Sequence, residues 1–185
     1  MKIFKFIDDL SNLSRWSQAY CAKNESVLEH TGFVALYSLS ICYKYKIHPD
    51  QVLIKALVHD VDEVITGDIP TPTKYANPKI LSEIRKLEDD AAKLISDELF
   101  EGKIFKKWKD SKDLNTDSGC IIAIADCAGV VYKIWQEVNV GNKSFLQFIV
   151  NIERALYSLY DNVKPIYRDE IKILLRLLGE LNENS

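Results

Sequence analysis

The sequence predicts an all-α, single-domain protein. Apolar residues recur at helical spacing through most of the 185 residues, glycine and proline are scarce (7 and 5), and the alternation typical of strands is absent. Apolar residues make up 47% of the chain, which suffices for one sizeable core, while the length is too small for two ordinary domains. We therefore expect residues 1–185 to form a single compact helical bundle.

The first half of the chain predicts two long helices and a loop. The periodic segment over residues 26–47 opens with a capping box, in which Ser26 is followed three residues later by Glu29. A second helix is expected over about residues 49–66, with a proline at its start. Residues 67–73 contain a glycine and two prolines, which should end the helix and form a loop.

The second half predicts further helices. The Asn77-Pro78 pair should start a helix that runs to about residue 99, and the lysine-rich residues 101–117 suggest a short helix and a loop. The most apolar segment follows, with Asp117 or Ser118 as its cap, and continues to about Val138. The last two helices are expected over about residues 144–160 and 165–181.

Composition excludes several classes of protein. The net charge is −3 and the pI is near 5.7, so the protein is mildly acidic. Proteins that coat duplex nucleic acid usually carry a basic surface, which argues against that class. Asp8 and Asp9 interrupt the N-terminus before a signal peptide could form, and no uninterrupted apolar run of about 18 residues predicts a membrane span. The four cysteines form no C-x-x-C pair, which argues against a zinc ribbon and favours a reducing cytoplasm.

The three histidines direct attention to one possible site. His48 lies in a polar turn and should be a surface residue. His59 and Asp60 instead interrupt an apolar run, where a charged residue is costly unless it is paired or bound to metal. Glu63 follows His59 by four residues, so on a helix both would face the same side.

Two further polar residues could complete a metal site. His30 is expected in the middle of the preceding helix, and Asp126 lies in the middle of the most apolar segment, where a carboxylate needs a partner. With His59 and Asp60 they make a mixed nitrogen and oxygen donor set, which suits a divalent transition metal with room for water. Spacing alone leaves open whether these helices meet, so a purely structural role remains an alternative.

The pattern of His30, His59-Asp60 and Asp126 resembles that of the HD-domain metal-dependent phosphohydrolases. Within that superfamily, three stretches are similar to the bacterial, YfbR-like 5′-deoxynucleotidases. They are Arg15-Trp16, residues 26–30 and the block HDVDEVITGDIPTPTKY over residues 59–75. The last block is highly specific, and the similarity extends over about residues 13–150.

The resemblance implies an HD-domain helical bundle with a defined site. It implies a divalent metal ion (Co²⁺, Mn²⁺ or Zn²⁺) bound by His30, His59, Asp60 and Asp126. It further implies that Glu63 activates or positions water, that Asp68 acts near the sugar and the attacked phosphate, and that Arg15 and Lys74 contact phosphate, with Trp16 packed against sugar or base. Each of three residues also has a purely structural alternative: Trp16 could pack against a helix edge, Lys74 could be solvated, and Asp68 could stabilise its own turn.

We therefore expect a cytoplasmic enzyme that converts deoxyribonucleoside 5′-monophosphates to deoxyribonucleosides and phosphate. One alternative is a triphosphohydrolase acting on dATP, for which Lys74 and Lys79 could bind the longer phosphate chain; another is a non-catalytic nucleotide-binding HD protein. The family resemblance also implies a homodimer. The C-terminal helix offers apolar surface for such a contact through Ile171, Ile173, Leu174, Leu175, Leu177 and Leu178.

Overall fold

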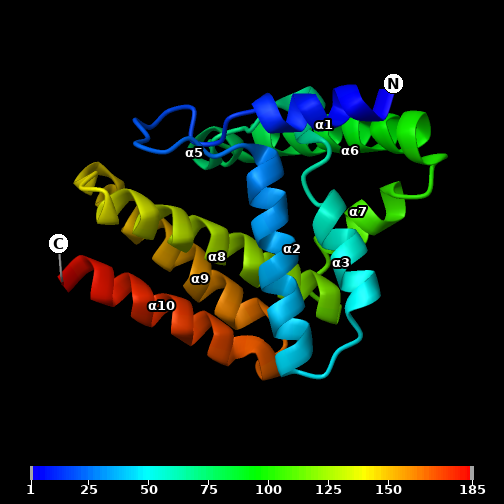
Figure 1. The fold of residues 1–185 in the computed structure, drawn as a ribbon. Coiled ribbons are helices and arrows are strands. Elements are labelled where there is room, and N and C mark those ends of the chain that lie inside the picture. Colours follow the sequence, from blue (N-terminus) through cyan, green and yellow to red (C-terminus); the bar gives the residue numbers. More distant parts are fainter. Residues whose placement is uncertain (1, 184–185) are drawn as a thin grey trace.

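The computed structural model describes residues 2–183, which form helices joined by short connections and contain no β-strand (Figure 1). The all-α prediction is confirmed. Long helices are α1 (Lys2–Asn12), α2 (Val27–Lys44), α3 (Pro49–Val58), α6 (Pro78–Phe100), α8 (Asp117–Asn139), α9 (Ile149–Asn162) and α10 (Arg168–Glu183). Short ones are α4 (Glu63–Thr66), α5 (Thr71–Lys74), α7 (Phe105–Ser111) and the 3-10 segments η1 (Lys143–Phe148) and η2 (Pro165–Tyr167).

The start of α2 is fixed by the expected capping box. The backbone N–H of Glu29 donates to the Ser26 hydroxyl at 3.1 Å, and the backbone N–H of Ser26 donates to the Glu29 carboxylate at 2.8 Å. Both bonds satisfy donors that a helix N-terminus would otherwise leave unpaired. Because the helix begins at Val27, His30 lies in its first turn and not in the middle of the helix, where the sequence analysis expects it.

The helix expected over residues 49–66 is interrupted. α3 ends at Val58, residues 59–62 form a turn, and α4 begins at Glu63. The turn is closed by short-range bonds, such as that from the Glu63 N–H to the Asp60 carbonyl at 3.1 Å. Successive side chains on a regular helix project about 100° apart, so the turn lets the adjacent His59 and Asp60 approach one centre.

Two other expectations need correction. Residues 67–70 are irregular as expected, but Thr71–Lys74 form one helical turn, α5, because a proline near a helix start lacks only an N–H that would be unpaired there. The cap of α8 is Thr116, whose hydroxyl accepts the Gly119 N–H at 3.0 Å, and neither Asp117 nor Ser118. α1 was not among the expected helices; it buries Phe6 and Leu10, one turn apart.

The core has two connected parts. α8 lies at the centre of the larger part and packs against α2, α3, α9 and α10. The smaller part joins α1, α6 and α7 to the ends of α2 and α3 through Val27 and Val58. α1 and α6 therefore lie across one end of the bundle, as Figure 1 shows. The boundary between the two parts is where the candidate site lies.

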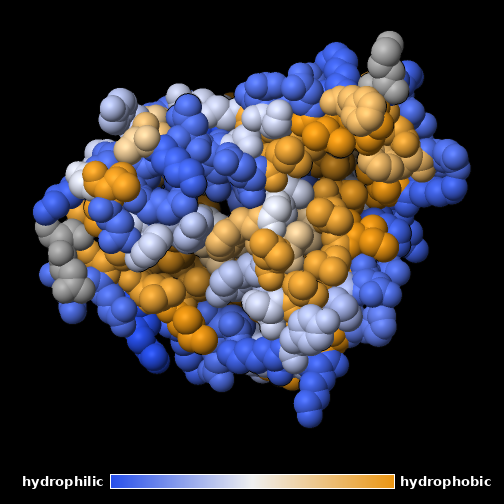
Figure 2. All heavy atoms as spheres, in the orientation of Figure 1, coloured by the Kyte–Doolittle hydropathy of each residue, from blue (hydrophilic) through white to orange (hydrophobic). Residues whose placement is uncertain are grey.

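α8 is long and apolar enough to cross a membrane by length and composition, but 67% of its most apolar window is buried inside the bundle. We assign it as the core helix. Apolar side chains that remain exposed gather partly over α1 and α3 in the view of Figure 2. They include Ile3, Phe4 and Ile7 on α1 and Ile54 and Leu57 on α3.

Candidate active site

His59 and Asp60 meet in the turn after α3. The Nδ1 atom of His59 lies 2.7 Å from the Ala56 carbonyl oxygen, which can only accept, so the proton of the neutral ring is on Nδ1. The Nε2 atom then presents its lone pair toward Oδ2 of Asp60, 2.9 Å away. A lone pair and a carboxylate at this distance repel each other unless a cation or a second ring proton lies between them.

His30 enters the same space from α2. Its side chain is fully buried, and its Nε2 atom lies 3.7 Å from Oδ2 of Asp60 and 3.0 Å from Oδ1 of Asp126 on α8. The rings of His30 and His59 are 5.4 Å apart between centroids. The four residues that the sequence predicts as ligands therefore come together from three elements of the fold.

The donor set fits a divalent metal ion. Ligand atoms of His30, His59 and Asp60 all lie within 4.8 Å of one another, and Asp126 adjoins them through its contact with His30. Among the described residues, neither nitrogen of His30 nor Nε2 of His59 has a hydrogen-bond partner, although all are buried. Buried polar atoms are normally satisfied, and a bound cation would explain the two orphaned Nε2 atoms, whereas Nδ1 of His30 would remain without a partner among the described residues.

The charges around the turn favour positive charge at its centre, from a ring proton or from a metal ion. Burial alone raises the pKa of Asp60, but the nearby His59, His30 and Arg15 together hold it well below its usual range. Burial alone lowers the pKa of His59, but Asp60 and Asp126 raise it above its ordinary value. The site therefore keeps its carboxylate ionised and favours positive charge on its partners.

Glu63 lies beside the ligands at the start of α4. Its Oε2 atom is buried and has no hydrogen-bond partner among the described residues. Burial and the neighbouring Asp60 and Asp68 raise the pKa of Glu63 to about 10, while Arg15 opposes the shift. The expected continuous helix through His59 and Glu63 is not formed, and the turn between α3 and α4 instead brings Glu63 close enough to Asp60 for their charges to interact.

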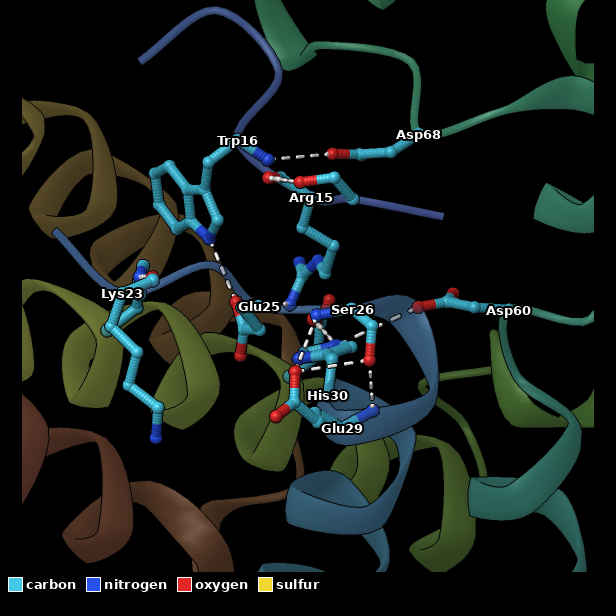
Figure 3. A network of polar contacts seen from close by, with 12 residues as sticks. Arg15, Trp16, Lys23, Glu25, Ser26, Glu29, His30, Asp60 and Asp68 are labelled. Atoms are coloured by element: carbon cyan, nitrogen blue, oxygen red, sulfur yellow. Dashed lines mark hydrogen bonds and ion pairs between the residues drawn. The ribbon is translucent and has the colours of Figure 1, made fainter. Parts of the chain in front are cut away.

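Arg15 and Trp16 cover the site from the connection between α1 and α2 (Figure 3). The guanidinium of Arg15 is largely buried, and Nη1 lies 3.7 Å from Glu25. Burial alone lowers the pKa of Arg15, but Asp126, Glu25 and Asp60 raise it above its ordinary value. Arg15 therefore remains a cation beside the ligand cluster.

Trp16 is held in an unusual conformation. Its φ of 63° lies in the left-handed region that non-glycine residues seldom adopt. Its backbone N–H donates to the Asp68 carboxylate at 3.3 Å, and its indole N–H donates to Glu25 at 2.9 Å (Figure 3). These contacts fix both the backbone and the ring of Trp16, and they bring Asp68 to the same edge of the site.

Three of the four predicted ligands, His59, Asp60 and Asp126, line a cavity of about 940 Å³. Residues of α5, α6 and α7 line it as well, and Lys74 is among them. The Lys74 ammonium donates to Glu88 at 2.6 Å, so it is paired and not freely solvated. The side chain of Asp126 is 48% exposed, so the ligand cluster can be reached from this cavity. His48 is exposed, as predicted.

Several supporting residues were not found by sequence reasoning. Glu25 orients the Trp16 ring, and the buried carboxylate of Asp62 accepts the Trp108 indole N–H at 2.7 Å, which ties the turn to α7. Gly129 packs against the His30 ring. No spacing rule links these residues: the partners of Asp62 and Gly129 lie on distant elements, and Glu25 and Trp16 lie in an irregular connection without periodic spacing.

A family model described as 5′-deoxynucleotidase YfbR-like matches residues 2–171. The chain belongs to this YfbR-like family. A 5′-deoxynucleotidase of Photorhabdus laumondii is 33% identical over 164 residues, which cover 83% of this chain and 82% of the relative. One from Yersinia pestis is 32% identical over the same length, with the same coverage. This YfbR-like protein is accordingly an enzyme of a hydrolase family.

Solved structures confirm the HD-domain fold of the YfbR-like protein. An HD-domain phosphohydrolase from Listeria innocua has a TM-score of 0.74 at 22% identity and covers 100% of this chain and 98% of its own. A cyanophage S-2L HD phosphohydrolase, bound to dA and one catalytic Zn²⁺ ion, has a TM-score of 0.64 at 18% identity, with 97% and 96% covered. At these identities the likeness establishes the fold alone.

We predict that Gly129 is required for metal binding by this YfbR-like protein. A Cβ atom there would lie 2.9 Å from Cε1 and 3.0 Å from Nδ1 of His30, so Gly129→Ala must displace the ring. Loss of support for a metal-binding histidine typically costs about 10–100-fold in affinity, and we expect such a loss of Mn²⁺ affinity by calorimetry. Gly32→Ala is the control, because its Cβ would meet nothing within 4 Å. Equal affinities of the two variants would contradict the assignment.

Proposed function

We propose that the protein hydrolyses deoxyribonucleoside 5′-monophosphates to deoxyribonucleosides and phosphate. The observation that carries the proposal is the convergence of His30, His59 and Asp60, with unpartnered buried nitrogens, beside a fixed Trp16–Asp68 contact. The two histidines and the aspartate fit the metal site of a hydrolase. The Trp16–Asp68 contact supplies a rigid edge that can distinguish deoxyribose from ribose. The names of the relatives from Photorhabdus laumondii and Yersinia pestis support the same substrate class.

The metal would be held by His30, His59, Asp60 and Asp126. Their mixed donor set admits Mn²⁺, Co²⁺ and Zn²⁺ and leaves positions for water and substrate. When bound, such an ion offsets phosphate charge and lowers the pKa of adjacent water.

The chain's own residues have separate tasks in the reaction. Arg15 binds the non-bridging phosphate oxygens, since its Nη1 atom is buried and without a hydrogen-bond partner among the described residues. Glu63, whose pKa the positive charge of a bound metal ion would lower, would orient the attacking water and take a proton from it, with Asp68 as the neighbouring carboxylate. The water oxygen bonds to phosphorus while the bond from phosphorus to the sugar 5′ oxygen breaks, and that oxygen takes up a proton. Lys74, paired with Glu88, would add positive charge on the cavity side.

Selection of the sugar would depend on Trp16 and Asp68. Two prolines stiffen the segment after Asp68, and Asp68 in turn holds the Trp16 backbone. A ribose placed against this edge would have to bury its 2′ hydroxyl without a partner, which costs about 1–3 kcal/mol. Trp16 would pack without reading base identity, so several bases should be accepted.

The triphosphate alternative is less well supported. Of the two lysines considered for a longer phosphate chain, Lys74 is paired with Glu88, and Lys79 is exposed and does not line the cavity. Other cations, Arg85, Lys86, Lys109 and Lys112, do line it, so the supply of positive charge does not separate the two substrates. The names of the relatives from Photorhabdus laumondii and Yersinia pestis favour the 5′-deoxynucleotidase activity. A non-catalytic nucleotide-binding role is also disfavoured, because Glu63 and all four ligand positions are filled.

We also infer a cytoplasmic, single-domain protein. The four cysteines Cys21, Cys42, Cys120 and Cys127 are free thiols, which suits a reducing compartment. Both parts of the core share α2 and α3, which supports one folding unit over residues 1–185.

The first test is a substrate panel with Mn²⁺, Co²⁺ and Zn²⁺. We expect free orthophosphate from dAMP and other deoxyribonucleoside monophosphates, at kcat/KM about 10–100-fold above that for AMP, which is the ratio that corresponds to the buried hydroxyl. Release of triphosphate from dATP with dAMP left intact would establish the alternative activity. Equal rates on AMP and dAMP would disprove the proposed selection against ribose but would leave the proposed phosphate hydrolysis intact.

The second test concerns Glu63. Glu63→Gln keeps the size of the side chain but removes the proton acceptor, so we expect turnover to fall by at least about 100-fold. Metal content should stay at the wild-type level, because Glu63 is not among the proposed ligands. Glu83→Gln, which alters an exposed carboxylate on α6, serves as the control. A Glu63→Gln rate within about threefold of wild type, a difference below about 1 kcal/mol, would show that the role is wrong.

The third test concerns the homodimer that we propose. Of the apolar residues on α10, Ile171, Leu174 and Leu178 are buried within the bundle, which leaves Ile173 and Leu177 exposed at 38% and 44%. α10 therefore offers less free apolar surface than its sequence implied, but two such residues one turn apart can still form a contact. Light scattering at micromolar concentration should give a dimer mass, and a monomer mass would contradict the proposal.

A further inference from the structure

The connection between α1 and α2 carries Arg15 and Trp16 and has little internal support of its own. Two backbone hydrogen bonds close its base: the Arg15 N–H donates to the Glu25 carbonyl and the Val27 N–H donates to the Leu13 carbonyl, both at 2.9 Å. In Figure 1 the rest projects away from α1 and α2 toward the C-terminal end of α8. Residues 17–24, which we term the site loop, contain no helix or strand, so contacts with other elements must hold them.

Glu137, near the end of α8, supplies those contacts. Its side chain is completely buried. Its carboxylate accepts the backbone N–H groups of Ala22 at 2.7 Å and Lys23 at 3.1 Å, and it also accepts the Asn142 amide at 2.8 Å and the Lys133 ammonium at 2.6 Å. Burial alone raises the pKa of Glu137, but these four donors lower it to about 2. The carboxylate thus stays ionised, and two of its four donors belong to the site loop.

Lys133 lies one turn earlier on α8 and is also completely buried. Besides Glu137, its ammonium donates to the backbone carbonyl of Lys23, again in the site loop. It lies 5.6 Å from the centre of the Phe145 ring. The Asn142 amide adds a bond to the Tyr20 carbonyl at 2.9 Å. Every backbone group bound by this side-chain cluster therefore belongs to the site loop.

The same cluster reaches Trp16 from a second direction. The Phe145 ring beneath Lys133 packs against the Trp16 ring, with 5.3 Å between centroids, and Phe148 packs at the same distance. Removing a buried ion pair from water is costly, and apolar residues at such positions often stabilise a protein equally well. A gain in the stability of the bundle therefore does not explain why Lys133 and Glu137 are charged. Their bonds to the site loop do explain it.

We propose that Lys133 and Glu137 are positioning residues, which hold the site loop against α8 so that Arg15 and Trp16 keep the geometry needed for phosphate binding and sugar selection. The proposal rests on the proposed function for its effect on the sugar. The anchoring of the loop stands on the contacts alone.

The test compares Glu137→Gln with the double variant Glu137→Gln/Lys133→Met. The single variant leaves the buried Lys133 charge uncompensated, so we expect it to lower the melting temperature. The double variant removes both charges and should fold with a melting temperature near wild type. In the folded double variant, we expect the Ala22 and Lys23 amides to exchange hydrogen about tenfold faster. We also expect KM for dAMP to rise and the preference for dAMP over AMP to fall, each by about tenfold, with unchanged metal content.

The matched control is Glu170→Gln on α10. Glu170 is another buried carboxylate, bonded to Lys44 and to the Tyr45 hydroxyl at 2.9 Å, but it does not touch the site loop. Its substitution should leave loop exchange and the sugar preference at wild-type values. A folded double variant with wild-type exchange, KM and sugar preference would overturn the proposal. Failure of the wild-type protein to hydrolyse dAMP would instead refute the proposed function, and the exchange experiment would still decide whether the loop is anchored.

Discussion

Two imidazole rings and a carboxylate that face one another in a buried space need positive charge between them, and the fold brings them together from α2 and from the turn after α3. His30 is placed by the capped start of α2, and His59 and Asp60 by the turn that ends α3. The tautomer of His59 is set by the Ala56 carbonyl, which leaves its free lone pair toward Asp60. Gly129 leaves the space that the His30 ring occupies. Without a positive charge at the centre, these groups would repel one another or stay unsatisfied.

The second half of the site depends on a loop that would otherwise be mobile. Arg15 brings a cation to the carboxylates, and Trp16 adopts a left-handed backbone that only strong external contacts would maintain. Asp68 and Glu25 provide those contacts nearby. The buried pair on α8 provides them from the far side of the loop, so the core helix carries the proposed metal ligand Asp126 at its middle and holds the site loop at its end.

The sequence was informative where the signal is local. Helical periodicity, the Ser26–Glu29 capping box and the 59–75 block predicted the all-α fold and the residues that converge. Periodicity continued through His59 and Asp60, so it concealed the turn that lets both side chains approach one centre. Three successive polar residues, Thr116 to Ser118, could each have capped α8, and only the Thr116 hydroxyl has the required bond. The bonds from Ala22 and Lys23 to Glu137 join residues more than a hundred positions apart, and no pattern in a single sequence reports such a contact.

A crystal structure of the protein grown with Zn²⁺ and recorded at the zinc absorption edge would test the central claim most directly. We predict one anomalous peak bonded to Nε2 of His30 and of His59 and to carboxylate oxygens of Asp60 and Asp126, at about 2.0–2.2 Å from each. Absence of a peak within reach of the two histidines, or a peak held by other residues alone, would contradict the account.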